Sequence, residues 1–278
     1  MTIPKPLRVG DTVAVIATSG PVNLEKLDAG VKVLHSMGLR VRIFESCFAQ
    51  HEYLAGADAL RLRDLHAAFA DREIRAIFPA RGGYGAARLL PHLDFDLIRK
   101  NPKIFAGYSD ITALHIALNQ CAGLATFHAP MVAADLADAD DDTLRSFQAH
   151  LFANGPAVGG RPLFFPKNGV LTGGNLSVIV SLIGTPFEID TCGKVLFLEE
   201  VGEAAYRVDR MLLQLKYAGK LRDAEGFVLG DFSGENIDLA IREILVPEGK
   251  PLVRDFPAGH CMPNFTLPLG RKFSNRCG

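Results

Sequence analysis

The chain has 278 residues, 48% of them hydrophobic, which is enough for one large domain or two of ordinary size around a packed core. Thirty lysines and arginines against 31 aspartates and glutamates leave a formal net charge of -1, and no basic block is interleaved with aromatic residues. This balance argues against a nucleic-acid partner and against an anionic membrane surface.

Targeting and metal-binding patterns are missing from the sequence. Residues 1–10 lack the apolar stretch of a secretory signal peptide, and later apolar runs are too short to span a bilayer, so we expect a cytoplasmic protein. No two histidines have the His-x-x-x-His spacing of a metal site, and we expect neither a metal nor a cofactor. The cysteines are scattered without a Cys-x-x-Cys pair, which argues against a zinc site and a disulfide framework; they are Cys47, Cys121, Cys192, Cys261 and Cys277.

The first half of the chain alternates between strand-like and helix-like segments. A β-branched run at residues 12–18 ends in Ser-Gly-Pro, which is typical of a buried parallel strand before a loop, and residues 23–37 carry apolar side chains at helical spacing. This alternation predicts an α/β unit with a mainly parallel sheet flanked by helices. Further strands are expected at residues 41–44, 74–79 and 103–106, and a helix is expected at 57–70.

A glycine-rich loop, RGGYG at residues 81–85, follows the third of these strands. Its backbone N–H groups could bind an anion at the start of the helical segment AARLL. Arg88 stands where a dinucleotide fingerprint needs its third glycine, and no Lys-Ser/Thr pair completes a phosphate-binding loop. Taken alone, the glycines are more simply explained by a tight strand-to-helix turn.

The stretch AGYSDITALHIAL places Ser109 and Asp110 between an apolar strand and an apolar helix. Both residue types are favoured helix caps, and capping is the simpler interpretation of Ser109. The alternative is a nucleophile at a sharp turn, where the helix dipole favours a developing negative charge. The segment is Gly-Tyr-Ser-Asp-Ile rather than Gly-x-Ser-x-Gly, and a serine nucleophile also needs a base with an orienting partner.

The character of the chain changes between residues 133 and 166, where an acidic stretch leads into a segment rich in Gly and Pro. We predict an N-terminal domain at 1–135, a linker region at 136–166 and a smaller C-terminal α/β domain at 167–278. The acidic stretch lacks the glycine and the glutamate of a calcium loop, and it is expected to precede a helix that begins near Thr143. Strands at 194–198 and 226–229 and a helix at 207–217 are expected in the second half.

Two segments of the second half offer partners for a serine nucleophile. His260 lies in the glycine-flanked loop GHCMPN, and such loops often carry function, although a solvated histidine explains it equally well. Glu199, Glu200 and Glu203 follow a strand predicted to be buried, at the edge where α/β sheets bind ligands. A solvated acidic loop is the simpler interpretation of these residues. Glu199 is closest to the apolar strand and is the one expected to be held rigidly.

Five blocks, taken in order, resemble the serine LD-carboxypeptidases, the family that includes murein tetrapeptide carboxypeptidases and microcin self-immunity hydrolases. They are RGGYGAARLL, GYSDITAL, TGGNLSVIVSLIGTP, LFLEEVGEAAYRVDRMLLQLKYAG and GHCMPNFTLPLG, and together they extend over almost the whole chain. The resemblance implies that Ser109 is the nucleophile, His260 its base and Glu199 the acid that orients the base. The active site then lies in the cleft between the two domains.

The same resemblance implies the reaction. It is the removal of the terminal D-alanine from murein tetrapeptides in cell-wall recycling, through an acyl-enzyme, by a protein expected to form a homodimer. The backbone N–H groups of Gly83 and Asp110 are the expected oxyanion hole. Arg81, Tyr84 and Asn175 are the expected contacts to the muropeptide substrate.

Two other functions stay open at this level. One is a non-catalytic α/β protein that binds a small anion or a nucleotide with residues 81–85. The other, within the resembled family, is a microcin-type hydrolase for aminoacyl-nucleotide-like amides, although the EEVGEAAYRVDRML block is more similar to the murein branch. The preferred diamino acid at the third peptide position is not indicated by the sequence.

Overall fold

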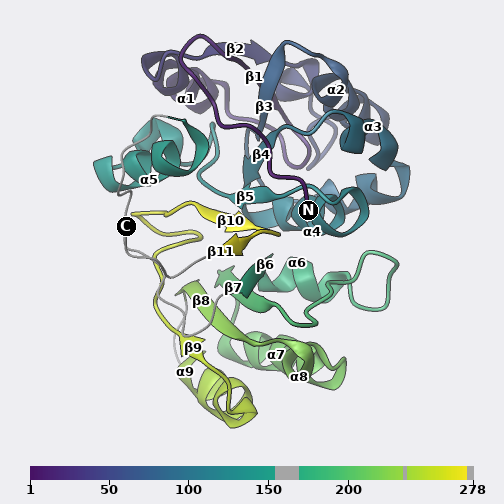
Figure 1. Ribbon diagram of the computed structural model, residues 1–278, viewed down its shortest axis with the longest axis vertical. Helices are drawn as coiled ribbons and strands as arrows, with labels where there is room; N and C mark the ends of the chain where they lie inside the picture. The colour runs from purple at the N-terminus through teal and green to yellow at the C-terminus, as the bar shows by residue number, and fades with distance from the viewer. Residues whose placement is uncertain (154–168, 234–236, 274–278) are drawn as a thin grey trace.

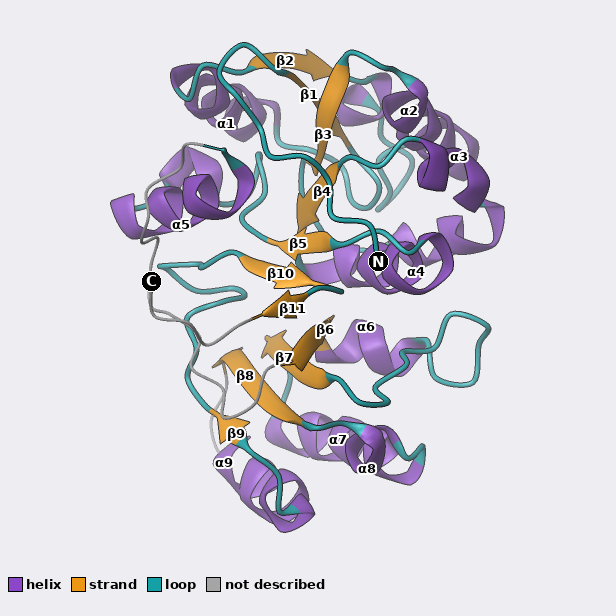
Figure 2. Ribbon diagram, in the orientation of Figure 1, coloured by secondary structure: helices purple, strands orange, loops and turns teal. Residues whose placement is uncertain are grey.

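The computed structural model describes residues 1–153, 169–233 and 237–273, and Figure 1 shows their arrangement. Strands and helices alternate along most of the chain (Figure 2). The strands are β1 (Thr12–Ile16), β2 (Arg40–Ile43), β3 (Ile74–Pro79), β4 (Ile104–Gly107), β5 (Thr126–His128), β6 (Gly169–Asn175), β7 (Val195–Val201), β8 (Gly226–Ser233), β9 (Leu252–Val253), β10 (Leu267–Leu269) and β11 (Lys272–Phe273). The helices are α1 (Leu24–Ser36), α2 (Asp58–Ala70), α3 (Phe95–Lys100), α4 (Thr112–Ala122), α5 (Asp141–Leu151), α6 (Leu176–Ser181), α7 (Ala205–Tyr217), α8 (Lys220–Asp223) and α9 (Ile237–Ala240). Short 3-10 or π turns cover Glu45–Phe48, Ala86–His92, Ser109–Ile111, Leu136–Asp138, Ile241–Leu245 and Val246–Glu248.

The first sheet carries the strands of the first half of the chain. Within the described residues it has six strands in the order β10-β5-β4-β3-β1-β2, and each neighbouring pair is parallel except β10 and β5. The chain passes from β1 to β2 and then returns to β3 on the other side of β1. The connections that leave the carboxyl ends of β1 and β3 therefore diverge, and open α/β sheets bind ligands in the crevice at such a point.

Helices cover both faces of this sheet, because its central strands are apolar on both sides. Successive side chains of a strand point to opposite faces. Val15 of β1 belongs to a buried cluster with Leu27 of α1 and Phe147 of α5. Ile16, the next residue, belongs to a different cluster with Phe69 of α2. Figure 1 accordingly shows α1 and α5 on one side of the sheet and α2 and α3 on the other.

The second sheet is smaller and lies below the first in Figure 1. In the described part of the chain it has five strands in the order β11-β6-β7-β8-β9, parallel except for the β11 and β6 pair. Helix α4 lies between the sheets, because its Leu114 and Leu118 belong to the same buried cluster as Leu176 of α6 and Leu196 of β7. The helix that follows Ser109 therefore joins the two halves of the molecule.

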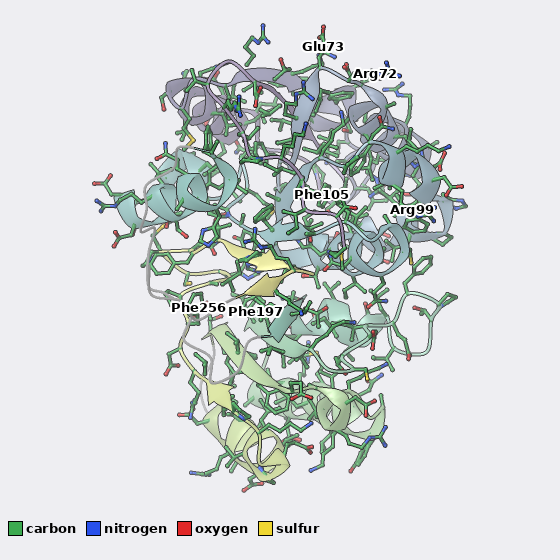
Figure 3. All side chains as sticks on the ribbon, viewed as in Figure 1. Arg72, Glu73, Arg99, Phe105, Phe197 and Phe256 are labelled. Carbon is green, nitrogen blue, oxygen red and sulfur yellow. The ribbon has the colours of Figure 1, made fainter. Side chains whose placement is uncertain are left out.

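Strand β10 also connects the two halves. It pairs antiparallel with β5 in the first sheet. Its Leu267 and Leu269 belong to one buried cluster with Phe197 of β7 and Phe256, both labelled in the lower half of Figure 3. The segment that contains His260 precedes β10 and is therefore held close to both sheets.

The predicted fold class is confirmed, with a mainly parallel first sheet flanked by helices and a smaller second α/β part. The structure adds details that the sequence did not predict. Residues 267–269, inside the predicted C-terminal range, extend the first sheet. The helix expected to begin near Thr143 is α5, which begins at Asp141 and occupies residues 141–151 of the predicted linker. The segment AARLL forms part of the 3-10 turn Ala86–His92 rather than an α-helix, and that turn contains Pro91. The linker residues 154–166 lie outside the described residues, and the domain limits stay predictions.

The described part of the chain contains neither a membrane-spanning helix nor a cluster of metal ligands. No helix within residues 1–153, 169–233 and 237–273 has the length and apolar character needed to cross a bilayer. In the same ranges, no three His, Cys, Asp or Glu side chains are grouped so that they could hold a metal ion. Cys47, Cys121, Cys192 and Cys261 are free thiols, whereas Cys277 lies outside the described residues.

Candidate active site

Ser109 lies at the turn between β4 and α4. Strand β4 ends at Gly107, Tyr108 is extended, and Ser109 has a φ of 63°, in the left-handed region that favours glycine. Strained residues of this kind occur at strand-to-helix turns that expose a nucleophile at the end of a sheet. The helix-cap interpretation of Ser109 is wrong, because neither the 3-10 turn at Ser109 nor α4 begins with a side-chain cap hydrogen bond.

Ser109, His260 and Glu199 form one chain of hydrogen bonds. His260 Nε2 lies 3.2 Å from Ser109 Oγ, and His260 Nδ1 lies 2.8 Å from Glu199 Oε2. An ionised carboxylate only accepts hydrogen bonds, so Nδ1 carries the hydrogen. In the neutral ring, Nε2 is then free to accept the serine hydroxyl. The fold thus brings together a serine from the first half of the chain and two partners from the second.

Glu199 is held inside the second sheet. Its side chain is fully buried, and the pairing of β7 with β8 shifts register between Leu198 and Glu200. Irregularities of this kind re-aim side chains next to active sites. Gly259, with a φ of 120°, runs so close that a Cβ there would lie 3.0 Å from Glu199 Oε2. A glycine at this position lets the loop carry His260 directly over the carboxylate.

Burial and hydrogen bonding shift the pKa values of both partners. Burial raises the pKa of Glu199, and the hydrogen bond from His260 opposes this only in part. Burial alone lowers the pKa of His260, but the hydrogen bond and charge of Glu199 outweigh it, so the pKa of the ring lies above its ordinary value. A higher pKa makes the imidazole a stronger base and stabilises the imidazolium that forms when it takes a proton.

The loop of His260 is anchored on two sides. Asn264 Oδ1 accepts an N–H from the loop backbone at 3.1 Å, and Asn264 N donates to Thr143 Oγ1 of α5 at 2.9 Å. The Tyr108 ring packs edge-on against the His260 ring, with 4.8 Å between centroids. The Tyr108 hydroxyl in turn donates to Asp135 Oδ1 at 2.8 Å. These contacts fix the position of the imidazole relative to Ser109.

A cavity of about 490 Å³ lies next to this chain of hydrogen bonds. Ser109 and His260 line it, together with Gly82, Gly83 and the start of α1. A cavity of this size holds a small ligand or part of a peptide. A buried acid, a base and a half-buried serine beside such a cavity have the arrangement of an acyl-transfer site.

Comparison with known proteins identifies the family. The family described as LD-carboxypeptidase N-terminal domain matches residues 13–129, and the LD-carboxypeptidase C-terminal domain matches residues 168–274. The chain belongs to the LD-carboxypeptidase family. It is therefore a serine carboxypeptidase, and the predicted family and enzyme class are confirmed.

Individual relatives cover nearly the whole chain. A probable murein peptide carboxypeptidase of Bacillus subtilis is 43% identical over 97% of this chain and 90% of its own length. The crystal structure of a muramoyltetrapeptide carboxypeptidase from Oxalobacter formigenes superposes with a TM-score of 0.83 at 31% identity, covering 94% of this chain and 93% of that one. The microcin C7 self-immunity protein MccF, in complex with aspartyl sulfamoyl adenosine, superposes with a TM-score of 0.88 at 25% identity, covering 98% and 95%.

In this LD-carboxypeptidase the glycine loop lies directly against the serine. A Cβ on Gly82 would lie 2.9 Å from Ser109 Oγ and 3.5 Å from the backbone N of Asp110. Gly20, in the loop after β1, donates its N–H to Gly82 O at 3.2 Å. The predicted oxyanion residues Gly83 and Asp110 thus belong to two segments that meet beside Ser109, and Gly83 lines the cavity. Their role in binding an oxyanion stays a prediction.

A buried arginine holds the glycine loop in place. Arg61 of α2 is fully buried and donates to the backbone oxygens of Thr18 and Gly85, the latter at 3.0 Å. It also forms an ion pair with Asp58. From the other side, Asp110 Oδ2 accepts a backbone N–H at 2.8 Å from the first residue of the 3-10 turn after the loop. The loops after β1, β3 and β4 are therefore tied to one another.

Two of the predicted substrate contacts lie in the glycine loop itself. Arg81 lines the cavity, and its guanidinium donates to Gly82 O and Pro21 O, each at 3.2 Å. Tyr84 is 54% exposed, does not line that cavity, and packs edge-on against Tyr53. Contact of either residue with the substrate stays a prediction.

The third predicted contact, Asn175, lies at the end of β6. It is buried, its Oδ1 caps α6, and its Nδ2 donates to Glu200 Oε1 at 3.1 Å. Glu200 Oε2 also accepts the N–H of Ser177 at 2.8 Å. Asn175 therefore organises the end of the second sheet next to Glu199, and it does not line the cavity that contains Ser109.

Several residues of the site were not singled out in the sequence. Lys26 and Asp135 line the cavity, and Arg61 supports the glycine loop. Lys26 and Arg61 occur in helical patterns where a charged residue usually faces solvent, and Asp135 belongs to an acidic stretch. Only Gly82 could have been found from the sequence, because two adjacent glycines often mark a place where the backbone approaches another group closely.

Proposed function

We propose that this protein is an LD-carboxypeptidase that removes the terminal D-alanine from murein tetrapeptides. The observation that carries the proposal is the chain of hydrogen bonds from Ser109 Oγ through His260 to the buried Glu199. Membership of the LD-carboxypeptidase family and the similarity to the probable murein peptide carboxypeptidase of Bacillus subtilis support the substrate class.

In the first half of the proposed reaction, Ser109 Oγ attacks the carbonyl of the third peptide residue. His260 Nε2 takes the serine proton as this bond forms, and Glu199 stabilises the imidazolium. The backbone N–H groups of Gly83 and Asp110 are proposed to bind the oxyanion. His260 then gives its proton to the amine of D-alanine, which leaves, and the tripeptide remains esterified to Ser109.

In the second half, water replaces D-alanine. His260 takes a proton from the water as it attacks the ester carbonyl, and returns it to Ser109 Oγ when the ester bond breaks. The products are D-alanine and a tripeptide with a free carboxylate. The pKa of His260, raised by Glu199, suits both proton transfers, because each one needs a base that is strong while neutral.

The test is the release of D-alanine from L-Ala-D-Glu-meso-diaminopimelate-D-Ala, measured with a D-amino-acid oxidase assay. We expect turnover of this peptide and no release from the same peptide ending in L-alanine. Failure to release D-alanine from the tetrapeptide under conditions where the protein is folded would contradict the proposal.

A second function is favoured by the similarity to MccF. That protein was observed with aspartyl sulfamoyl adenosine. The corresponding activity for this chain would be hydrolysis of an aminoacyl-nucleotide-like amide in place of a murein peptide. The same Ser109, His260 and Glu199 would serve both reactions. Competing the tetrapeptide against aspartyl sulfamoyl adenosine distinguishes them, and we expect a higher kcat/KM for the tetrapeptide. The non-catalytic anion-binding alternative is wrong, because the chain belongs to a family of enzymes.

The cellular setting follows from the same proposal. We infer that the protein acts on muropeptides in the cytoplasm during peptidoglycan recycling and that it works as a homodimer. Light scattering of the purified protein measures the oligomeric state, with a dimer as the expected result. Fractionation of cells, followed by detection of the protein, measures the location.

A further inference from the structure

One positively charged side chain that lines the active-site cavity, Lys26, has no part in the proposed mechanism. Lys26 lies in the first turn of α1 and lines the same cavity as Ser109 and His260. Its side chain is 52% exposed, and its ammonium lies 3.8 Å from a carboxylate oxygen of Asp138, which is 73% exposed. Exposed ion pairs of this kind contribute little to stability. The ammonium can therefore turn to another anion at small cost.

The other charged groups on this side of the cavity are engaged by the protein. Arg81 donates to two backbone carbonyls, which set the position of its guanidinium. Asp135 accepts the Tyr108 hydroxyl at 2.8 Å and the backbone N–H of Met131 at 3.0 Å, and burial raises the pKa of its carboxyl. Lys26 is consequently the charged group here that is best able to meet an anionic ligand.

We propose that the Lys26 ammonium binds a carboxylate of the peptide substrate. This rests on the proposed function, because the murein tetrapeptide carries carboxylates on both sides of the scissile amide. One belongs to the terminal D-alanine, and another lies at the end of the meso-diaminopimelate side chain. A charge-assisted hydrogen bond to either group adds to substrate binding and acts on KM more than on kcat.

A structural role for Lys26 makes a different prediction. The pair with Asp138 joins α1 to the 3-10 turn Leu136–Asp138, which follows the cavity residue Asp135. If this pair mattered through the position of the turn, removing Asp138 would be as harmful as removing Lys26. The substitution Asp138→Asn breaks the pair and leaves the ammonium free. Lys32 supplies a matched control, because it lies on the same helix, does not line the cavity and pairs with Asp28.

The experiment compares kcat and KM of wild type, Lys26→Met, Lys32→Met and Asp138→Asn on three peptides. These are the tetrapeptide, its C-terminal D-alaninamide and the analogue with L-lysine at the third position. We expect Lys26→Met to raise KM for the tetrapeptide about 10-fold, in the range of hydrogen bonds to charged groups. The other two variants stay within about twofold of wild type, as expected for exposed ion pairs. The wild type discriminates against one analogue, and Lys26→Met loses that discrimination.

The lost discrimination identifies which carboxylate Lys26 binds. If Lys26→Met no longer discriminates against the D-alaninamide, Lys26 binds the terminal carboxylate. If the variant no longer discriminates against the L-lysine peptide, Lys26 binds the side-chain carboxylate. A Lys26→Met enzyme with wild-type KM on the tetrapeptide, or an Asp138→Asn enzyme with the same defect, overturns the inference. Wild type that releases no D-alanine contradicts the proposed function instead. Calorimetry of the tetrapeptide with wild type and Lys26→Met then tests Lys26 alone, and equal affinities would overturn it.

Discussion

The Glu199 carboxylate controls His260 from inside the core of the second sheet. A fully buried acid has no water to exchange its hydrogen bond with, so the contact from His260 Nδ1 at 2.8 Å is retained and the tautomer of the ring is fixed. Glu203, four residues further on, instead forms an exposed ion pair with Arg207. Two acids of one block therefore differ in environment, because Glu199 is buried and Glu203 is partly exposed.

The pH dependence of kcat/KM follows from this coupling. Only neutral His260 accepts the serine proton, and its pKa lies above the ordinary 6.5, so kcat/KM should rise with pH through a midpoint above 6.5. Glu199→Gln removes the charge that raises this pKa, so the midpoint should move to lower pH and kcat should fall about 10³- to 10⁴-fold. Glu203→Gln is the control and should keep the wild-type profile. If Glu203→Gln lowered kcat and Glu199→Gln did not, Glu203 rather than Glu199 would be the acid that orients His260.

Gly82 is the second residue on which the site depends. A Cβ there would lie 2.9 Å from Ser109 Oγ, so Gly82→Ala should displace the serine or the loop and lower kcat by at least about 10²-fold, the cost of misplacing a reacting group by an ångström. Gly184→Ala is the control, because φ is 82° there but no atom lies within 4 Å of the added Cβ. It should reduce stability by about 1 kcal/mol and leave kcat unchanged. Equal kcat in both variants would contradict the close approach.

At the level of elements, α2 supports the loops at the carboxyl ends of β1 and β3. Its Arg61 donates to backbone oxygens of both loops, although nothing in the helical pattern distinguishes it from a solvated arginine. Arg88 binds the same partner, Asp58, from the surface. The two arginines therefore separate the effect of a buried support from that of an exposed ion pair.

Replacing Arg61 should affect stability and turnover together. Arg61→Met leaves the carbonyls of Thr18 and Gly85 without a donor, and we expect the free energy of unfolding to fall by about 2–4 kcal/mol. Arg88→Met removes an exposed pair and should cost less than about 1 kcal/mol. Denaturant unfolding measures both, and the same preparations give kcat/KM. An Arg61→Met protein as stable and active as wild type would show that the loops hold their position without it.

At the level of the whole molecule, the site depends on the two halves being fixed to each other. Helix α4 and strand β10 pack against both sheets, and the loop of His260 is bonded to α5 through Asn264 and Thr143. Thr143→Val leaves a buried N–H of Asn264 unpaired, which should cost about 1–3 kcal/mol. Because the loop also loosens, kcat should fall with little change in KM. Unchanged kcat would indicate that Thr143 stabilises the fold without positioning His260.

The sequence was sufficient for the parts of the fold that depend on local pattern. Continuous apolar runs predicted β1, β3 and β7, and the alternation of strands and helices predicted the mainly parallel arrangement of the first sheet. Strand β10 was missed because it has three residues, one of them Pro268, and pairs with a strand far away along the chain. Local pattern has no signal for such a contact.

Local sequence patterns predicted less of the site than of the fold. Local statistics favoured a helix cap for Ser109, and only the ordered family blocks pointed to His260 and Glu199 as its partners. Lys26 and Arg61 could not be recognised, because their roles depend on which loops fold against them.

If Ser109 is the nucleophile, D-alanine release must depend on its hydroxyl, and the variant Ser109→Ala removes that hydroxyl. Ser36→Ala is the matched control, because the Ser36 hydroxyl is exposed and bonds only to the backbone of α1. We predict that Ser109→Ala retains its fold and lowers kcat for the tetrapeptide by at least about 10³-fold, while Ser36→Ala keeps the wild-type rate. Release of D-alanine by Ser109→Ala at the rate of Ser36→Ala would show that Ser109 is not the nucleophile.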